Sequence, residues 1–191
     1  NDGTYIIIGA SKGGVCRVFQ NSENSFDDYG YRVKLGEGKI AATNWQSADY
    51  QIVYENGKVE ITGNMNLVKQ KIATPIMLTG LRVVSAVLGN KIIGMLKKLI
   101  ILVDKKTDIR FKRGITICQD RLVIDDYISS PESIKLECAD SFSLRHVASG
   151  KFFSLTDIGN HSREQFANVK EIRIQRVFYF QDKRMEEKVV I

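Results

Sequence analysis

Cysteine is scarce in this sequence, and its scarcity excludes two kinds of small-domain architecture. The three residues are Cys16, Cys118 and Cys138, and no two of them form a CxxC pair. An odd number without that spacing provides neither a disulfide framework nor a zinc knuckle. Each cysteine lies in a strand-like run with apolar residues nearby, which is typical of a buried free thiol. We therefore expect free thiols, although the sequence leaves open a bridge between one pair.

Long hydrophobic runs and a leader-like start are also absent. The most apolar stretch, Ile92–Val103, is interrupted by Lys97 and Lys98 and is too short to span a bilayer. The chain opens on NDGTYIII, without the basic segment and apolar core of a signal peptide. Because it enters a strand almost at once, we expect a fragment of a longer protein, and its localisation stays open.

Proline is rare as well, and nothing in the sequence marks a domain boundary. Only two prolines occur, and we find no repeat, low-complexity tract or linker, so residues 1–191 are expected to form one domain. The chain is 43% hydrophobic and 26% charged, which is the composition of a globular protein. Its net charge of +6 favours an anionic partner, such as an acidic glycan, nucleic acid or an anionic membrane surface.

Alternating apolar and polar residues predict strands over most of the chain. The clearest hairpin is Tyr50–Gly63, where Asn56 and Gly57 suit a type I′ turn because both tolerate positive φ. Other strands are expected at Thr4–Gly9, Gly14–Gln20, Gly30–Leu35 and Lys39–Trp45, in a hairpin at Asp108–Ile128, and near the C-terminus on both sides of Gln181–Lys183. Residues 74–98 instead show three- and four-residue spacing, which predicts one or two short helices. We therefore predict an all-β fold, an antiparallel β-sandwich of about a dozen strands.

A glycine-rich stretch near the N-terminus looks like the start of a phosphate-binding loop. Lys12-Gly13-Gly14 matches the first part of the pattern KGGxGK[ST]. The pattern continues with a glycine, a lysine and a hydroxyl residue, which bind phosphate and Mg²⁺. This sequence has Cys16, Arg17 and Val18 at those positions. A phosphate loop also opens a helix, whereas the residues that follow here alternate like a strand. We expect a hairpin turn, and neither a nucleotide nor another cofactor.

The remaining candidates for chemistry are isolated. His146 and His161 have no partners at metal-ligand spacing, so we expect no metal site, and we assign no catalytic residue. Neighbouring carboxylates such as Asp125 and Asp126 point to opposite faces of a strand and do not form an acid–base couple. Arg113 and Asp126 face each other across the predicted hairpin and suit a structural cross-strand pair.

Two groups of residues have expected roles. Asp28 is expected to cap the turn before the next strand, so Asp28 and Gly30 are structural candidates. Asp126 is a third structural candidate, because it faces Arg113 across the predicted hairpin. Basic residues interleave with aromatic ones toward the C-terminus, a composition that suits an acidic polysaccharide or single-stranded nucleic acid, although no nucleic-acid-binding signature supports the latter. The candidate contacts for an acidic ligand are Lys12, Arg17, Arg113, His146 and Lys151.

Three short stretches also share a family pattern: KGGVCRVF at Lys12–Phe19, DYGY at Asp28–Tyr31, and the hairpin Arg113–Ile128 that contains Asp126. With them the chain resembles the β-sandwich domain that ends heparinase II/III-like proteins. The resemblance implies that the parent protein cleaves a polysaccharide by β-elimination, in which a base removes the proton next to a uronic acid carboxylate. That reaction needs an (α/α)-toroid domain with catalytic Tyr and His residues, which 191 mostly β residues cannot contain.

We therefore expect an accessory C-terminal domain that packs against an upstream helical domain of the same parent chain and helps to form a cleft for an acidic polysaccharide. One alternative is a free-standing carbohydrate-binding module, which coplanar exposed aromatic rings on one sheet face would favour. Another is a structural or assembly domain without a ligand, which a large exposed apolar patch and the lack of a concave basic groove would favour.

Overall fold

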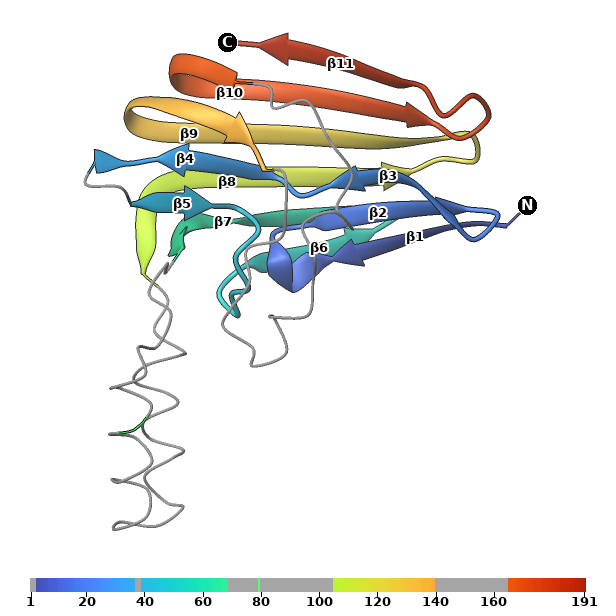
Figure 1. Ribbon diagram of the computed structural model, residues 1–191, viewed down its shortest axis with the longest axis horizontal. Coiled ribbons are helices and arrows are strands. Elements are labelled where there is room, and N and C mark those ends of the chain that lie inside the picture. Colours follow the sequence, from blue (N-terminus) through green and yellow to red (C-terminus); the bar gives the residue numbers. More distant parts are fainter. Residues whose placement is uncertain (1–2, 37–38, 69–78, 80–104, 140–164) are drawn as a thin grey trace.

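The computed structural model describes residues 3–36, 39–68, 79, 105–139 and 165–191 (Figure 1). In these ranges nearly all of the regular structure is β, and every strand pair is antiparallel. The strands are β1 (Thr4–Gly9), β2 (Val15–Gln20), β3 (Glu23–Asp28), β4 (Tyr31–Lys34), β5 (Ile40–Ala42), β6 (Gln51–Glu55), β7 (Lys58–Val68), β8 (Lys106–Ile117), β9 (Arg121–Cys138), β10 (Gln165–Tyr179) and β11 (Met185–Val190). One short 3₁₀ turn, η1 (Ala10–Lys12), lies between β1 and β2.

Five of the strands close into a small barrel. β4 pairs with β5, β5 with β7, β7 with β8, β8 with β9, and β9 with β4 again. Two long strands make the closure, because each changes partner along its length. One edge of β7 pairs with β6 over Lys58–Thr62 and then with β5 over Asn66–Val68, while its other edge pairs with β8. One edge of β9 pairs with β8 over Leu122–Ser129 and then with β4 over Leu136–Cys138.

The sheet continues beyond the barrel on both sides. β10 pairs with nearly the whole length of β9, and β11 pairs with β10 at one edge (Figure 1). Within the described ranges β6 pairs with β7 alone and forms the other edge. A separate sheet of β1, β2 and β3 lies over one face of this larger sheet.

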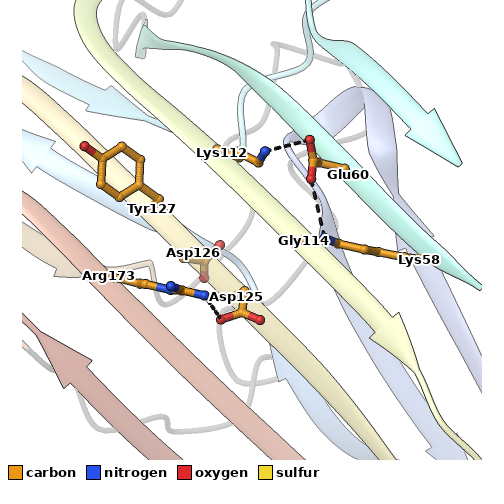
Figure 2. A pocket seen from close by; sticks show the side chains of 8 residues that line it. All are labelled: Lys58, Glu60, Lys112, Gly114, Asp125, Asp126, Tyr127 and Arg173. Carbon is orange, nitrogen blue, oxygen red and sulfur yellow. Dashed lines mark hydrogen bonds and ion pairs between the residues drawn. The ribbon is translucent and has the colours of Figure 1, made fainter. Parts of the chain in front are cut away.

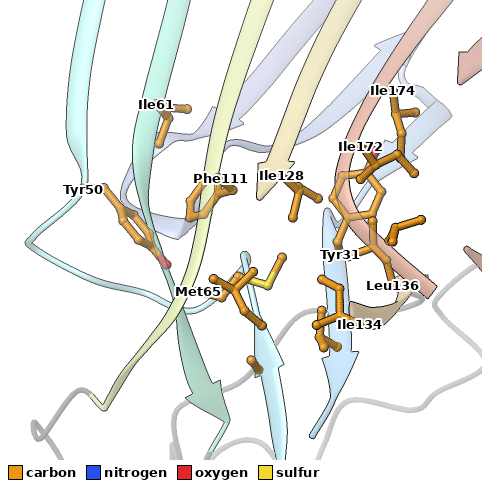
Figure 3. Close-up of a cluster of buried hydrophobic side chains, with 14 residues drawn as sticks. Tyr31, Tyr50, Ile61, Met65, Phe111, Ile128, Ile134, Leu136, Ile172 and Ile174 are labelled. Carbon is orange, nitrogen blue, oxygen red and sulfur yellow. The ribbon is translucent and has the colours of Figure 1, made fainter. Parts of the chain in front are cut away.

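Two hydrophobic clusters fill the interior. The larger cluster occupies the barrel and includes Tyr31, Ile61, Phe111, Ile128 and Ile174, whose side chains converge from several strands (Figure 3). The smaller cluster joins Cys16, Val18 and Phe26 of the small sheet to Ile115, Leu122, Ile124 and Phe178 of the large one. Burial of these apolar faces is the main force that holds the two sheets together.

Most of the predicted strands are confirmed, and so are four of the predicted hairpins. Asn56 and Gly57 have φ of 49° and 75°, the positive values that a type I′ turn requires, between β6 and β7. The glycine-rich stretch is a connection between two paired strands, and the residues after Gly14 form β2 rather than a helix. The hairpins β8–β9 and β10–β11 also lie where the sequence predicts them.

The structure differs from the prediction in its architecture and in one strand. The all-β antiparallel class is confirmed, but a five-strand barrel with extra strands replaces the simple sandwich of about a dozen strands, because β7 and β9 each pair with three other strands. β3 was not predicted, since Glu23–Asp28 contains few β-formers. The turn before it uses Asn21 and Ser22 at positive φ, which few non-glycine residues adopt. The helices expected at residues 74–98 lie outside the described residues.

Candidate functional site

Three stretches that are far apart in the sequence meet at one cluster of buried charged side chains. The cluster joins Asp28 of β3, Tyr31 of β4, Arg113 of β8, Asp126 of β9 and Arg176 of β10, and we call it the buried network. None of these five residues is more than 7% exposed. Because each comes from a different strand, the network ties the small sheet, the barrel and β10 together.

Arg113 is the centre of the buried network. Its Nε and Nη2 donate to the two carboxylate oxygens of Asp126 at 2.6 and 2.9 Å. Its Nη1 donates to the Gly14 carbonyl oxygen at 3.1 Å and to Asp28 Oδ1 at 3.3 Å. The predicted cross-strand pair is therefore confirmed as a two-pronged ion pair, the strongest geometry for arginine and carboxylate.

Arg176 and Tyr31 complete the network, and the sequence reading missed both. Arg176 Nη2 lies 2.7 Å from Tyr31 Oη, 2.8 Å from Asp126 Oδ2 and 2.9 Å from Asp28 Oδ2. A signal for Arg176 exists in the sequence, because it occupies an inward position in the alternation between Ile174 and Phe178. A charged residue in a row of inward apolar residues needs a buried partner.

The network lies at the boundary between the two hydrophobic clusters. Along β10, Ile174 belongs to the larger cluster and Phe178 to the smaller one, with Arg176 at the inward position between them. β8 and β9 repeat this order with Arg113 and Asp126. The charged layer therefore separates two apolar layers and fixes how the strands align.

The electrostatics of the network favour support over proton transfer. Two arginines balance two aspartates, so the cluster is neutral as a whole. Burial alone would raise the pKa of Asp28, but Arg113 and Arg176 hold that pKa below its ordinary value. Burial raises the pKa of the Tyr31 phenol well above its ordinary range. Neither group changes protonation near neutral pH, so we assign the network a structural role.

The turn between β3 and β4 confirms the predicted capping role of Asp28. Asp28 Oδ1 accepts a hydrogen bond from the Gly30 backbone N–H at 2.7 Å. Gly30 has a φ of 74°, and a Cβ at this position would collide with the Thr43 hydroxyl oxygen. Glycine is therefore required here both by the backbone conformation and by the close approach of Thr43.

The structure describes three of the five candidate contacts for an acidic ligand, and their environments differ. Arg113 is 1% exposed, which corrects its expected ligand role, because a side chain held inside the network cannot reach a ligand. Lys12 ends η1 and is half-buried. Arg17 lies on β2, where it donates to both carboxylate oxygens of Asp27 at 2.6 and 3.0 Å. His146 and Lys151 lie outside the described residues.

An open hollow lies on the outer face of the large sheet (Figure 2). It measures about 340 Å³ and is lined by Lys58, Glu60, Lys112, Gly114, Asp125, Asp126, Tyr127 and Arg173. These residues come from β7, β8, β9 and β10, and we call the feature the Gly114 hollow. Sequence reasoning missed it, because it depends on which outward residues become neighbours across four strands.

Salt bridges hold the charged side chains around the Gly114 hollow. Glu60 accepts from Lys112 Nζ at 2.9 Å and lies 3.5 Å from Lys58 Nζ (Figure 2). The hydrogen bond from Lys112 lowers the pKa of Glu60, so this carboxylate stays charged at neutral pH. Asp125 Oδ1 accepts from Gln175 at 3.0 Å and from Arg173 at 3.4 Å.

The outer face of the small sheet carries two aromatic rings. Tyr5 and Phe19 stack on each other with ring centroids 4.9 Å apart, and Arg17 lies 5.7 Å from the Phe19 ring. Rings stacked in this way cover each other's faces and do not form the coplanar platform on which sugars stack. This pair therefore gives no support to a free-standing carbohydrate-binding module.

Other kinds of site are not evident in the described part of the chain. The described residues contain no group of three or more His, Cys, Asp and Glu side chains that could hold a metal ion. All three cysteines are free, Cys16 is buried, and Cys118 and Cys138 are half-buried. No helix within the described ranges has the length and apolar character needed to cross a lipid bilayer.

The comparisons with known proteins add no relative. A scan against family models matched no family, and searches of curated proteins and of solved structures found no match.

Proposed function

We propose that this chain is the accessory C-terminal β domain of a heparinase II/III-like polysaccharide lyase-type protein, where it helps to form a cleft for an acidic polysaccharide. In this proposal the domain binds and positions the glycan and is not catalytic alone. The reacting groups belong to a helical domain of the same parent chain. The observation that carries the proposal is the Gly114 hollow, a concave site with three cationic side chains on an exposed sheet face.

The buried network supports the family part of the proposal. The stretches behind the resemblance each place a group in it: the Gly14 carbonyl, Asp28, Arg113 and Asp126. Residue types that recur because they hold a fold together are expected to meet in space in this way.

A second candidate is an assembly domain, which the edge strand β6 favours. Ile52, Val53 and Tyr54 are 48%, 54% and 74% exposed, and among the described residues β6 pairs with a strand on one side only. In the proposed parent protein this edge is where the upstream helical domain would pack. The two candidates are distinguished by ligand binding, because an assembly domain has no affinity for a soluble polysaccharide.

Calorimetric titration of the chain with heparin tests the proposal. We expect binding at low salt that weakens as the salt concentration rises, since screening reduces the attraction between cations and a polyanion. A neutral polysaccharide such as dextran is the control and should give no heat. An absence of heparin binding at low salt would contradict the glycan role.

The gene tests the proposed parent protein. It should encode a helical region upstream of Asn1, and a reading frame that begins near Asn1 would exclude such a parent protein.

A further inference from the structure

We propose that the Gly114 hollow is a subsite for one acidic sugar unit, whose carboxylate or sulfate binds between Lys112 and Arg173 and whose hydroxyls donate to Glu60 and Asp125. This inference rests on the proposed function and specifies where the polysaccharide binds.

The strand register places the charged side chains in two neighbouring rows. Lys112 pairs with Tyr127 and Tyr127 with Arg173, so two cations flank a phenol in one row across β8, β9 and β10. In the next row Glu60 pairs with Gly114 and Gly114 with Asp125. Directly opposed residues have Cβ atoms roughly 5 Å apart, so each row is about as wide as a sugar ring with its substituents.

Gly114 makes room between the two carboxylates. It is the only position in its row from Glu60 to Asp125 without a side chain, and the end of the flexible Lys58 side chain lies over it. A ligand that moves the Lys58 side chain aside has a carboxylate on each side and the cation row along one edge. The volume of about 340 Å³ fits one sugar unit and lies at the lower end of the range for small-molecule sites.

The charge balance favours an anionic ligand. Lys58, Lys112 and Arg173 carry three positive charges, while Glu60 and Asp125 carry two negative ones. Asp126 also lines the hollow, but Arg113 and Arg176 already balance its charge inside the molecule. One positive charge therefore remains, and a ligand with one carboxylate or sulfate neutralises it. A neutral sugar would leave that charge without compensation.

The carboxylates retain capacity to accept hydrogen bonds from hydroxyls. Among the described residues, both donors to Asp125 use Oδ1, which leaves Oδ2 for a ligand. Glu60 is 29% exposed at its side chain and stays ionised beside Lys112. Charged acceptors form stronger hydrogen bonds with hydroxyl donors than neutral ones do. The site thus offers cations for the acid group and anions for the hydroxyls of the same sugar.

Two variants test the subsite. Gly114→Val fills the hollow without changing charge. The nearest atom to an added Cβ is Lys58 Cε at 3.1 Å, and a flexible lysine end can move aside. Gly36→Val is the matched control, because an added Cβ there meets nothing within 4 Å. The double variant Lys112→Gln/Arg173→Gln removes the two proposed anion contacts.

Lys106→Gln is the charge control. Lys106 lies on the same strand as Lys112, is 52% exposed at its side chain against 53% for Lys112, and also forms a salt bridge, with Asp49 at 3.0 Å. Circular dichroism and thermal melting confirm that each variant is folded before binding is measured. The probe is a heparin-derived tetrasaccharide, with a neutral glucose tetrasaccharide as comparison.

Calorimetry should give a tetrasaccharide affinity at least about tenfold weaker for Gly114→Val and for the double variant, with both controls within about twofold of the unmodified protein. The neutral tetrasaccharide should not bind. If the unmodified protein binds heparin and neither variant weakens binding, the subsite is refuted, and the glycan role then depends on another surface of the protein. If the unmodified protein binds no heparin at low salt, both the subsite and the proposed function fail.

Discussion

Replacing Arg113 by methionine tests whether the buried network holds the fold together. The substitution keeps an unbranched side chain of similar length and removes one guanidinium group from a neutral cluster. Asp126 then loses two hydrogen bonds of 2.6 and 2.9 Å, and Asp28 loses its contact at 3.3 Å. Arg176 is left to balance two buried carboxylates.

The expected magnitude follows from that imbalance. Breaking a buried ion pair by removing one partner costs about 3–5 kcal/mol, because the other charge stays buried without compensation. For a domain of this size each kcal/mol lowers the melting temperature by roughly 2–4 °C. We therefore expect Arg113→Met to lower the free energy of unfolding by about 4 kcal/mol and the melting temperature by roughly 8–16 °C.

Urea denaturation followed by tryptophan fluorescence measures this loss. The single tryptophan, Trp45, is 3% exposed and becomes solvated on unfolding. Arg110→Met on the same strand is the control, because Arg110 is exposed and should change stability by no more than about 0.5 kcal/mol.

A double variant sharpens the test. Arg113→Met/Asp126→Leu leaves Arg176 and Asp28 as a balanced pair 2.9 Å apart. We expect it to be more stable than Arg113→Met alone, with a coupling energy of about 2 kcal/mol. A loss below about 1 kcal/mol for Arg113→Met, or a double variant that simply adds the two single losses, would refute the reasoning.

Two further predictions concern acid stability and the glycine-rich connection. Because the pKa of Asp28 is lowered in the folded protein, its stabilisation is present above the unfolded pKa of about 3.9 and is lost as the pH falls below it. Urea titrations should show stability falling below about pH 4, and Asp28→Asn should flatten that fall; an unchanged slope would contradict this. Gly13 has a φ of 65°, and a Cβ there would collide with the Thr43 carbonyl oxygen, so Gly13→Ala should cost about 2–3 kcal/mol in a urea titration. Equal stability of Gly13→Ala and Gly36→Ala would contradict that assignment.

The buried network and the Gly114 hollow lie on opposite faces of the same strands. Asp126 points inward to Arg113, and its neighbour Asp125 points outward to Arg173 and Gln175. In the pairing of β8 with β9, Arg113 is opposite Asp126, and the preceding residue Lys112 is opposite Tyr127 on the outer face. The network therefore positions the hollow, and variants that loosen it should also weaken the proposed ligand site.

Local structure could be predicted from the sequence where one short stretch contains the whole signal. Asn56-Gly57 indicates a hairpin because both residues tolerate positive φ, and the alternation around it marks two strands. The pairing of Arg113 with Asp126 follows from their equal distance from the turn between β8 and β9. The capping turn at Asp28 and Gly30 is equally local.

Long-range arrangement could not be predicted, because alternation shows which side chains point inward but not which strands are neighbours. β7 and β9 have one continuous pattern each, yet both change partner along their length, and this closes the barrel. The Gly114 hollow depends on four strands in register, so no single segment contains its signal. Arg176 was detectable as an inward charge, but its partners lie on three other strands.

The most direct test of the account is to map the binding surface of the heparin tetrasaccharide by the changes in ¹H–¹⁵N amide chemical shifts during a titration. The account predicts that the largest shifts fall on the outer face of β7 to β10, at Lys112, Gly114, Asp125, Tyr127 and Arg173. Shifts that gather instead on the small sheet around Arg17, or no shifts at low salt, would contradict it.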